Sequence, residues 1–175
     1  SVSGIVPGTS GWTFKPNGSI AIGQLGAFSR IIADQGEVTV GVWSSGGTLL
    51  RSATVNSGGE LRENSYFSTI DPLFLVPLQT YHVGVYSSSG SIFMDIYDPL
   101  AAPGDTISLS PLMILGGLAS SPTGFSFPAA ENQGDGAMYL GPNLVFLPIP
   151  EPGSMALIGL AAGCFLFFRR GIRPQ

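Results

Sequence analysis

Apolar and polar residues alternate along much of the chain, and the clearest example is a pair of stretches in its first third. Glu37–Trp43 and Thr48–Val55 flank the turn-forming segment Ser44–Gly47. Alternation with a period of two is typical of a strand with one buried face, and a short glycine-containing turn between two such stretches predicts a β-hairpin. The stretches Thr80–Tyr86 and Ser91–Tyr97 are arranged in the same way, so we expect a second hairpin there.

Shorter alternating stretches open and close the same region. They are Trp12–Phe14 and Ser19–Ile22 around Pro16–Gly18, and Ala137–Leu140 and Asn143–Phe146 around Gly141 and Pro142. No window up to residue 147 places apolar residues at a helical spacing between capping residues. The pattern therefore predicts an all-β fold, an antiparallel β-sandwich of the jelly-roll or carbohydrate-binding type. We expect at least seven strands in residues 11–147 and no helix longer than two turns.

One short sequence occurs twice. Val40–Ser45 (Val-Gly-Val-Trp-Ser-Ser) is repeated as Val83–Ser88 (Val-Gly-Val-Tyr-Ser-Ser). Two copies do not make a repeat array, so we interpret them as equivalent parts of two hairpins. Gly41 and Gly84 are expected to lie where another backbone or an aromatic ring comes close.

Composition and charge restrict the possible functions. The 175 residues include 25 glycines and 14 prolines, 44% are hydrophobic and only 10% are charged. This combination excludes a wholly disordered chain and argues against a helix bundle, whose surface needs many charged side chains. Residues 1–153 hold four basic residues and all eleven acidic ones, a net charge of −7. Such an acidic body repels phosphate backbones, so we expect no nucleic-acid partner.

The end of the sequence has a different pattern. Met155–Phe168 contains no charged residue, and Arg169, Arg170 and Arg173 follow it. Basic flanks stay on the cytoplasmic side of a membrane, so this pattern predicts one short transmembrane helix with the body outside the cell membrane. With Gly153 and Ser154 the uncharged segment has 16 residues. A helix of that length is roughly 24 Å long, less than the hydrocarbon core of about 30 Å, which favours a sorting signal over a permanent anchor. A buried core helix is the alternative, although the segment has no polar face.

Prolines alternate with other residues just before the apolar segment. Pro148, Pro150 and Pro152 each fix φ and lack an N–H group, so we expect an extended, exposed linker that a peptidase can accept. The predicted organisation is a β-sandwich domain over residues 1–147, a Pro-rich linker over residues 148–153, a membrane helix over residues 154–168 and a basic cytoplasmic tail over residues 169–175.

The sequence Ile-Pro-Glu-Pro-Gly-Ser at residues 149–154, the apolar segment and the arginines together resemble the PEP-CTERM sorting signal of exported Gram-negative bacterial proteins. The matching residues are the sorting motif Pro150, Glu151 and Pro152 and the topology-setting basic stop Arg169, Arg170 and Arg173. This resemblance implies recognition by an exosortase, a membrane cysteine transpeptidase, with cleavage near the motif and release or attachment at the cell surface. The resemblance also implies a typical source, bacteria that make extracellular polysaccharide.

The body carries a second resemblance. The segments concerned are Gly11–Phe14, Ile22–Phe28, Val40–Val55, Leu78–Tyr86 and Tyr139–Asn143. They are similar to a β-sandwich domain of unknown function that is common in PEP-CTERM proteins. The resemblance implies a fold like that of carbohydrate-binding sandwiches and assigns no chemistry.

Candidate chemical groups are few. His82 is the only histidine, and its position in the strand places its side chain on the other face from Tyr81, Val83 and Val85. We interpret it as a surface residue, since a catalytic triad or metal site would need partners that the sequence does not display. The scattered carboxylates, including the loop Glu131–Gly136, fit turn chemistry better than a calcium site. We therefore expect no cofactor, no metal and no enzymatic activity.

Aromatic side chains are the remaining candidates for ligand binding. Trp43 and Tyr86, together with Trp12 and Tyr97, have the ring faces needed to stack on sugars, and packing in the core is their alternative role.

We predict a non-enzymatic protein of the cell surface or extracellular matrix that an exosortase processes after transient anchoring in the lipid bilayer. A carbohydrate-binding module acting on exopolysaccharide is the first alternative, and an exported hydrolase is the second. Ser1–Thr9 lacks the features of a signal peptide, so export is expected to depend on a signal outside this sequence.

Overall fold

The computed structural model describes residues 8–88, 96–97, 107–109, 111–119, 124–131, 138–139 and 142–147. The strands are β1 (Gly8–Pro16), β2 (Ile20–Phe28), β3 (Glu37–Ser44), β4 (Leu49–Asn56), β5 (Glu60–Arg62), β6 (Ser65–Leu75), β7 (Tyr81–Ser87), β8 (Ile96–Tyr97), β9 (Ile107–Leu109), β10 (Leu112–Ala119), β11 (Ala130–Glu131), β12 (Met138–Tyr139) and β13 (Pro142–Leu147), and the helix is α1 (Ser29–Gln35). Within these residues, the prediction of at least seven strands and no helix longer than two turns is confirmed.

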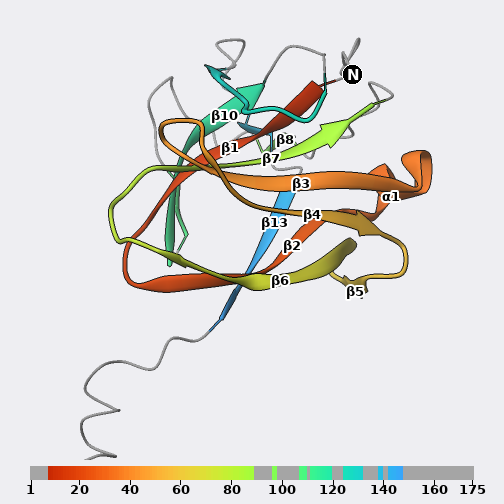
Figure 1. Ribbon diagram of the computed structural model, residues 1–175, viewed down its shortest axis with the longest axis horizontal. Helices are drawn as coiled ribbons and strands as arrows, with labels where there is room; N and C mark the ends of the chain where they lie inside the picture. Colours follow the sequence, from red (N-terminus) through yellow and green to blue (C-terminus); the bar gives the residue numbers. More distant parts are fainter. Residues whose placement is uncertain are drawn as a thin grey trace, which may run out of the picture.

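The strands form two main antiparallel sheets, which lie one above the other in Figure 1. The seven-stranded sheet has the order β11-β10-β1-β7-β3-β4, and β9 also pairs with β10. The four-stranded sheet has the order β13-β2-β6-β5, and a separate pair joins β8 to β12. The predicted all-β class is therefore confirmed for the part of the chain described.

The core lies between the two sheets and follows the predicted alternation. Val40 and Val42 of β3 and Val83 and Val85 of β7 are completely buried. They belong to one apolar cluster with side chains of the four-stranded sheet, among them Ile20, Ile22, Leu25 and Leu75. Complete burial of such a side chain contributes about 1.5–3 kcal/mol, so this shared interior is what holds the two sheets together.

The first predicted hairpin is confirmed. Strands β3 and β4 pair antiparallel from Glu37 opposite Asn56 to Trp43 opposite Leu49. Gly47 has a φ of 81°, and its N–H donates to the Ser44 carbonyl over 3.0 Å. Glycine is favoured at such a positive φ because it has no Cβ, which explains why this turn was visible in the sequence.

The second predicted hairpin is wrong. Strand β7 is paired along its whole length, with β1 on one edge and β3 on the other. No edge is left for Ser91–Tyr97, and the described part of that stretch, β8, pairs with β12 instead. The long-range partners of β7 therefore outcompete its neighbour in the sequence.

The alternating stretches at both ends of the body form strands, but their turns connect different sheets. Strand β1 lies in the seven-stranded sheet and β2 in the four-stranded one. In the same way, β12 pairs with β8, whereas β13 pairs with β2. The pattern correctly predicted strands here and said nothing about which strands pair.

Helix α1, which carries the chain from β2 to β3, was not predicted. Its buried residues are the adjacent Ile31 and Ile32, which do not produce a helical spacing in the sequence. The helix ends at Gly36, which has a φ of 79° and donates its N–H to the Ile32 carbonyl over 2.8 Å. A residue with a Cβ rarely adopts such a positive φ, so glycine suits this position at the end of the helix.

Within the described residues, no helix has the length and apolar character needed to cross a membrane. The predicted membrane helix at 154–168, the linker at 148–153 and the basic tail at 169–175 all lie outside the described residues.

Candidate functional site

Three glycines lie side by side across the centre of the seven-stranded sheet. Gly84 of β7 is opposite Gly11 of β1 on one side and opposite Gly41 of β3 on the other. The two copies of the repeated sequence are therefore neighbouring antiparallel strands. A Cβ on Gly11 would lie 1.8 Å from the carbonyl oxygen of Val83, a separation that real atoms do not reach. The glycine row lets these three backbones and their covering residues approach closely.

Residues 124–129 cover this face of the sheet. Phe125 occupies the space above Gly41, since a Cβ there would lie 2.5 Å from its ring. Phe127 packs over Gly47, and Pro128 lies near Gly84. The backbone N–H of Ser126 donates to the hydroxyl of Thr9 over 3.2 Å. The expectation that Gly41 lies beneath an aromatic ring is confirmed.

Trp43 is part of this covered face. Only 3% of the residue is exposed, and its ring lies 5.1 Å from that of Phe125 and 6.5 Å from that of Phe127. These contacts favour the packing role for Trp43, because a ring that stacks on a sugar needs one accessible face. Tyr86 is half-buried on the same face, so it keeps part of its surface available.

Trp12 also serves packing rather than an open surface. It is buried, and its ring lies 5.2 Å from that of Phe14. Its indole N–H donates to the carbonyl oxygen of Pro142 over 3.1 Å. Of the sequence candidates for stacking, Tyr97 has no described side chain.

His82 is half-buried between a hydroxyl group and an aromatic ring. Its Nδ1 lies 3.0 Å from the Thr13 hydroxyl oxygen, and the edge of its ring meets Phe127 with 5.0 Å between ring centres. Trp43 lies opposite His82 on the neighbouring strand. Burial lowers the pKa of His82 below its usual value, because the charged form loses hydration. The neutral imidazole therefore fits this position.

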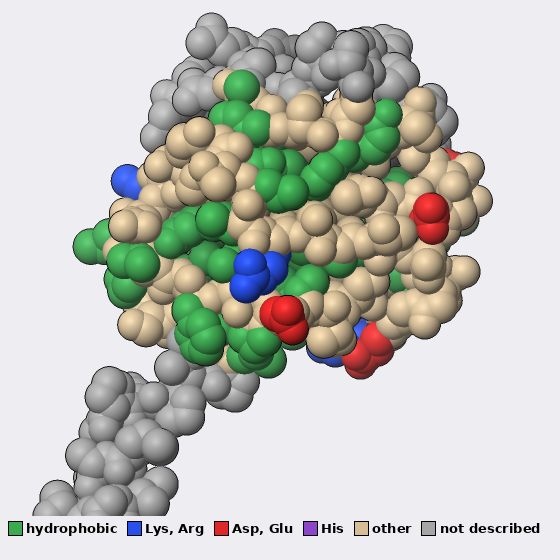
Figure 2. All heavy atoms as spheres, in the orientation of Figure 1, with side chains coloured by type: hydrophobic (Ala, Val, Ile, Leu, Met, Phe, Trp, Pro, Cys, Tyr) green, Lys and Arg blue, Asp and Glu red, His purple; other side chains and the backbone are tan. Residues whose placement is uncertain are grey.

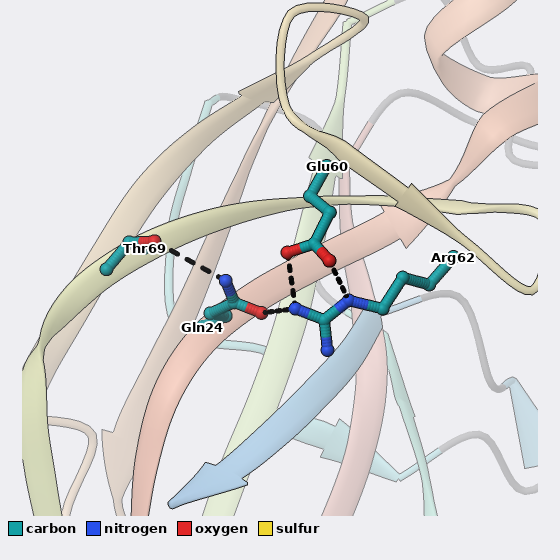
Figure 3. Close-up of polar contacts among 4 residues, drawn as sticks. All are labelled: Gln24, Glu60, Arg62 and Thr69. Atoms are coloured by element: carbon teal, nitrogen blue, oxygen red, sulfur yellow. Dashed lines mark hydrogen bonds and ion pairs between the residues drawn. The ribbon is translucent and has the colours of Figure 1, made fainter.

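The outer face of the four-stranded sheet carries a different arrangement, an exposed polar row made of Gln24, Glu60, Arg62 and Thr69 (Figure 3). Arg62 Nε donates to Glu60 Oε1 over 2.6 Å, and Arg62 Nη2 donates to the other carboxylate oxygen of Glu60. The same Nη2 donates to Gln24 Oε1 over 2.7 Å, and Gln24 Nε2 donates to the Thr69 hydroxyl over 3.4 Å.

The polar row is held in place by its own hydrogen bonds and by one ring. The bond from Arg62 lowers the pKa of Glu60, and the bond to Glu60 raises the pKa of Arg62, so both groups remain charged. The Arg62 guanidinium lies 5.6 Å from the centre of the Phe67 ring. A Cβ on Gly26 would lie 2.4 Å from the same ring, so that glycine lets Phe67 lie flat beneath the row. The result is a set of planar donors and acceptors with fixed directions on an open sheet.

Within the described part of the chain, no group of three or more His, Cys, Asp and Glu side chains is arranged to hold a metal ion. The loop carboxylates considered in the sequence lie outside the residues whose side chains are described. The predicted sorting motif and basic stop, Pro150, Glu151, Pro152, Arg169, Arg170 and Arg173, also lie outside the described residues.

The comparison with protein families decides the nature of this last segment. Residues 148–170 match the family model of the PEP-CTERM protein-sorting motif. The chain carries a PEP-CTERM sorting motif. The match includes Pro150, Glu151 and Pro152 of the predicted motif, and Arg173 lies beyond it. No curated protein and no solved structure matches the chain.

The motif supports export of the protein and its sorting by an exosortase, with anchoring in the membrane before processing and an extracellular location afterwards. It occupies the residues directly after Leu147, the last residue of β13. The sandwich therefore joins the sorting signal through the edge strand of its four-stranded sheet.

Sequence reasoning missed two features of the sandwich surface. The covering role of Phe125 and Phe127 had only a weak signal in the sequence, two phenylalanines separated by one residue. The polar row had none, because its residues come from β2, β5 and β6 and are brought together only by strand pairing.

Proposed function

We propose that this chain is an exported, non-enzymatic protein of the cell surface or the extracellular polysaccharide matrix. The observation that carries the proposal is the PEP-CTERM sorting motif at residues 148–170. The sandwich is the cargo, and the exosortase separates it from a transient membrane anchor formed by residues 154–168.

The surroundings of the polar side chains support a cargo without catalytic chemistry. His82 contacts Thr13, and Phe127 packs against the edge of its ring. The charged groups of the polar row bind one another and remain in the open on a sheet face. General acid–base catalysis needs groups aimed at a substrate in a site that excludes water, and these groups are arranged differently.

Processing by an exosortase is the central test. The full chain, exported behind a heterologous signal peptide, is expressed in a host with an exosortase and in the same host without it. We expect loss of the C-terminal segment by intact-mass measurement only where the enzyme is present. Glu151→Ala should abolish this loss, whereas Glu37→Ala, which removes an exposed carboxylate from β3, should not. Equal processing of the two variants, or processing without the enzyme, would contradict the proposal.

A second candidate function, binding of exopolysaccharide, is favoured by the polar row. Sugar hydroxyls occur in pairs that match the planar side chains of Gln24, Glu60 and Arg62, and hydrogen bonds fix these side chains before any ligand arrives. A Trp43 variant would test glycan binding poorly, because Trp43 is buried and its removal would also disturb packing.

Glycan-array binding by the sandwich-bearing chain tests this second candidate. Arg62→Ala should abolish binding, while Arg51→Ala, which removes an exposed arginine of β4 that bonds the neighbouring Leu50 carbonyl, should leave it unchanged. Absence of binding by the parent chain, or equal loss in both variants, would contradict a glycan site at the polar row. Release of shortened glycans would instead indicate an exported hydrolase.

A further inference from the structure

Four large apolar side chains are exposed at one corner of the sandwich. The exposed fractions are 69% for Phe74, 52% for Val76, 69% for Leu78 and 38% for Leu147. We call this group the apolar corner. Figure 2 shows hydrophobic side chains on the lower side of the molecule, toward which the arrow of β13 points in Figure 1.

The sheet register brings the first and last of these residues together. Phe74 of β6 and Leu147 of β13 are both opposite Ala21 of β2, so they flank it on the two sides of one row. A Cβ on Gly23 would lie 2.7 Å from the Leu147 side chain. The Leu147 side chain therefore occupies the space above Gly23 of β2, which has no side chain of its own. The row forms a continuous apolar strip.

A tightly held turn adds the other two residues. The N–H of Gln79 donates to the Val76 carbonyl over 3.3 Å, and the N–H of Leu78 donates to the Pro16 carbonyl over 2.9 Å. The N–H of Val76 donates to the Tyr81 hydroxyl over 3.0 Å. Three hydrogen bonds thus fix the backbone that carries Val76 and Leu78.

Leu78 occupies an unfavourable backbone conformation within this turn. Its φ is 62°, and proline at the preceding position with a positive φ at the next one is the arrangement of a type II turn, which favours Gly or Asn there. A leucine in this conformation destabilises the folded state, and its side chain, which is mostly in solvent, contributes little burial in return. Such strain is a reason to look for a function of the exposed side chain.

The segments that form the apolar corner carry no charge. Pro72–Thr80, Pro16–Gly23 and Pro142–Leu147 contain no Asp, Glu, Lys, Arg or His, and the charged residues Lys15 and Asp71 directly precede the second and the first of them. Contact with an apolar phase therefore buries no charged group from these segments, and buried charges are what make such contact unfavourable.

The corner is also the point at which the sandwich joins its sorting signal. Leu147 is followed directly by the motif at residues 148–170. Six linker residues, 148–153, precede the proposed membrane helix, and six residues cannot span more than about 20 Å. This short linker thus keeps the apolar corner, and not the opposite end of the sheets, next to the bilayer.

We propose that the apolar corner rests on the phospholipid bilayer while the precursor is anchored, inserting Leu78 and its neighbours at the boundary between headgroups and acyl chains. The proposal rests on the membrane anchoring in the proposed function. Contact with lipid fixes the orientation of the sandwich and holds the linker at the depth where a membrane-embedded peptidase acts. The acidic body offers no attraction to anionic lipid, so the apolar side chains supply the contact.

Lipid contact can be measured with a fluorophore at one corner residue. In the full chain with Cys164→Ala, Leu78→Cys is labelled with an environment-sensitive dye and reconstituted in vesicles of phosphatidylethanolamine and phosphatidylglycerol, with or without a spin-labelled phosphatidylcholine that quenches dyes in contact with lipid. The matched control is Leu61→Cys, which replaces an exposed leucine of β5, opposite Tyr66 at the other end of β6. Flotation of the vesicles reports anchoring separately.

We expect the chain to float with the vesicles and spin-labelled lipid to remove more than about half of the fluorescence at position 78, with little loss at position 61. Flotation with no quenching at either position would overturn the inference and leave the proposed anchoring intact. If iodide, added as an aqueous quencher in a parallel measurement, also fails to quench position 78, the corner is covered by protein, either this chain or a second copy of it, and the lipid contact is overturned. Absence of flotation would contradict the anchoring itself.

Discussion

The indole N–H of Trp12 donates a hydrogen bond of 3.1 Å to the carbonyl oxygen of Pro142. Trp12 belongs to β1 of the seven-stranded sheet, and Pro142 is the first residue of β13, the last strand before the sorting motif. The bond therefore joins the two sheets at the strand that connects the sandwich to its processing signal. Any pull on the C-terminal segment acts first on this edge strand.

Trp12→Phe should destabilise the sandwich by about 1–3 kcal/mol, because the buried Pro142 carbonyl loses its donor while most of the ring remains. Urea unfolding followed by circular dichroism measures this difference. Trp43→Phe is the control, since it also shortens a buried ring whose contacts are with Phe125 and Phe127. An equal loss in the two variants would attribute the effect to ring size and not to the hydrogen bond.

Gly11→Ala should be among the most damaging small substitutions in the chain. Its Cβ would lie 1.8 Å from the Val83 carbonyl oxygen and 2.7 Å from the Gly84 Cα, and backbone atoms cannot move aside as a side chain can. We expect a loss of about 3 kcal/mol or more in the free energy of unfolding. Gly116→Ala in β10 of the same sheet is the control, because a Cβ there meets nothing within 4 Å. Similar stability of the two variants would contradict the close approach of β1 and β7.

These strands also show what the sequence could predict and what it could not. The hairpin of β3 and β4 was predicted correctly because both strands and the turn between them lie in one short stretch. The partners of β7 were predicted wrongly, since β1 and β3 lie far from it along the chain and local alternation carries no information about distant pairing. The repeated Val-Gly-Val sequence was the available signal, because its two copies turned out to be neighbours.

The candidate sites divide in the same way. The sorting motif is a contiguous sequence, so it was identified without a structure, and the family model matches it at residues 148–170. The polar row and the apolar corner are made by register, for example by Gln24 lying opposite Thr69 and Phe74 opposite Ala21. Helix α1 was not predicted, because its buried residues are two adjacent isoleucines, which show no helical spacing in the sequence.

The stability of the sandwich should depend on the protonation of its single histidine. Burial lowers the pKa of His82 in the folded protein, whereas a histidine in the unfolded chain has a pKa of about 6.5. The unfolded state thus binds the proton more readily, and the free energy of unfolding should decrease as the pH falls from about 6.5 toward the pKa of His82 in the folded protein. Urea unfolding at a series of pH values measures this slope.

His82→Gln is the control for this pH dependence, because the amide does not titrate and retains an acceptor for the Thr13 hydroxyl. The difference between the parent and variant curves isolates the histidine from the carboxylates, which are the same in both. A proton NMR titration of the one imidazole gives the direction of its pKa shift independently. Parallel curves for the two proteins, or a raised pKa by NMR, would contradict the burial of His82 beside Phe127.

Leu160→Arg should impair membrane retention of the precursor and leave the sandwich folded. Leu160 lies near the middle of Met155–Phe168, a segment that is apolar on all sides, so one sandwich surface would cover only part of it. Exposing the remainder to water is unfavourable by roughly 25 cal/mol per Å² of apolar surface, whereas lipid surrounds every side. An arginine at the centre of a membrane helix opposes insertion by about 3 kcal/mol, enough to shift the segment out of the bilayer.

Leu160→Val is the control for this prediction, because it keeps the segment apolar and should be retained like the parent chain. Vesicle flotation and urea unfolding of the three proteins separate an effect on insertion from an effect on the fold. A Leu160→Arg variant that stays with the membrane would contradict anchoring by this segment. A variant whose sandwich unfolds would place the segment in the protein core, because only there does the charge act on the fold.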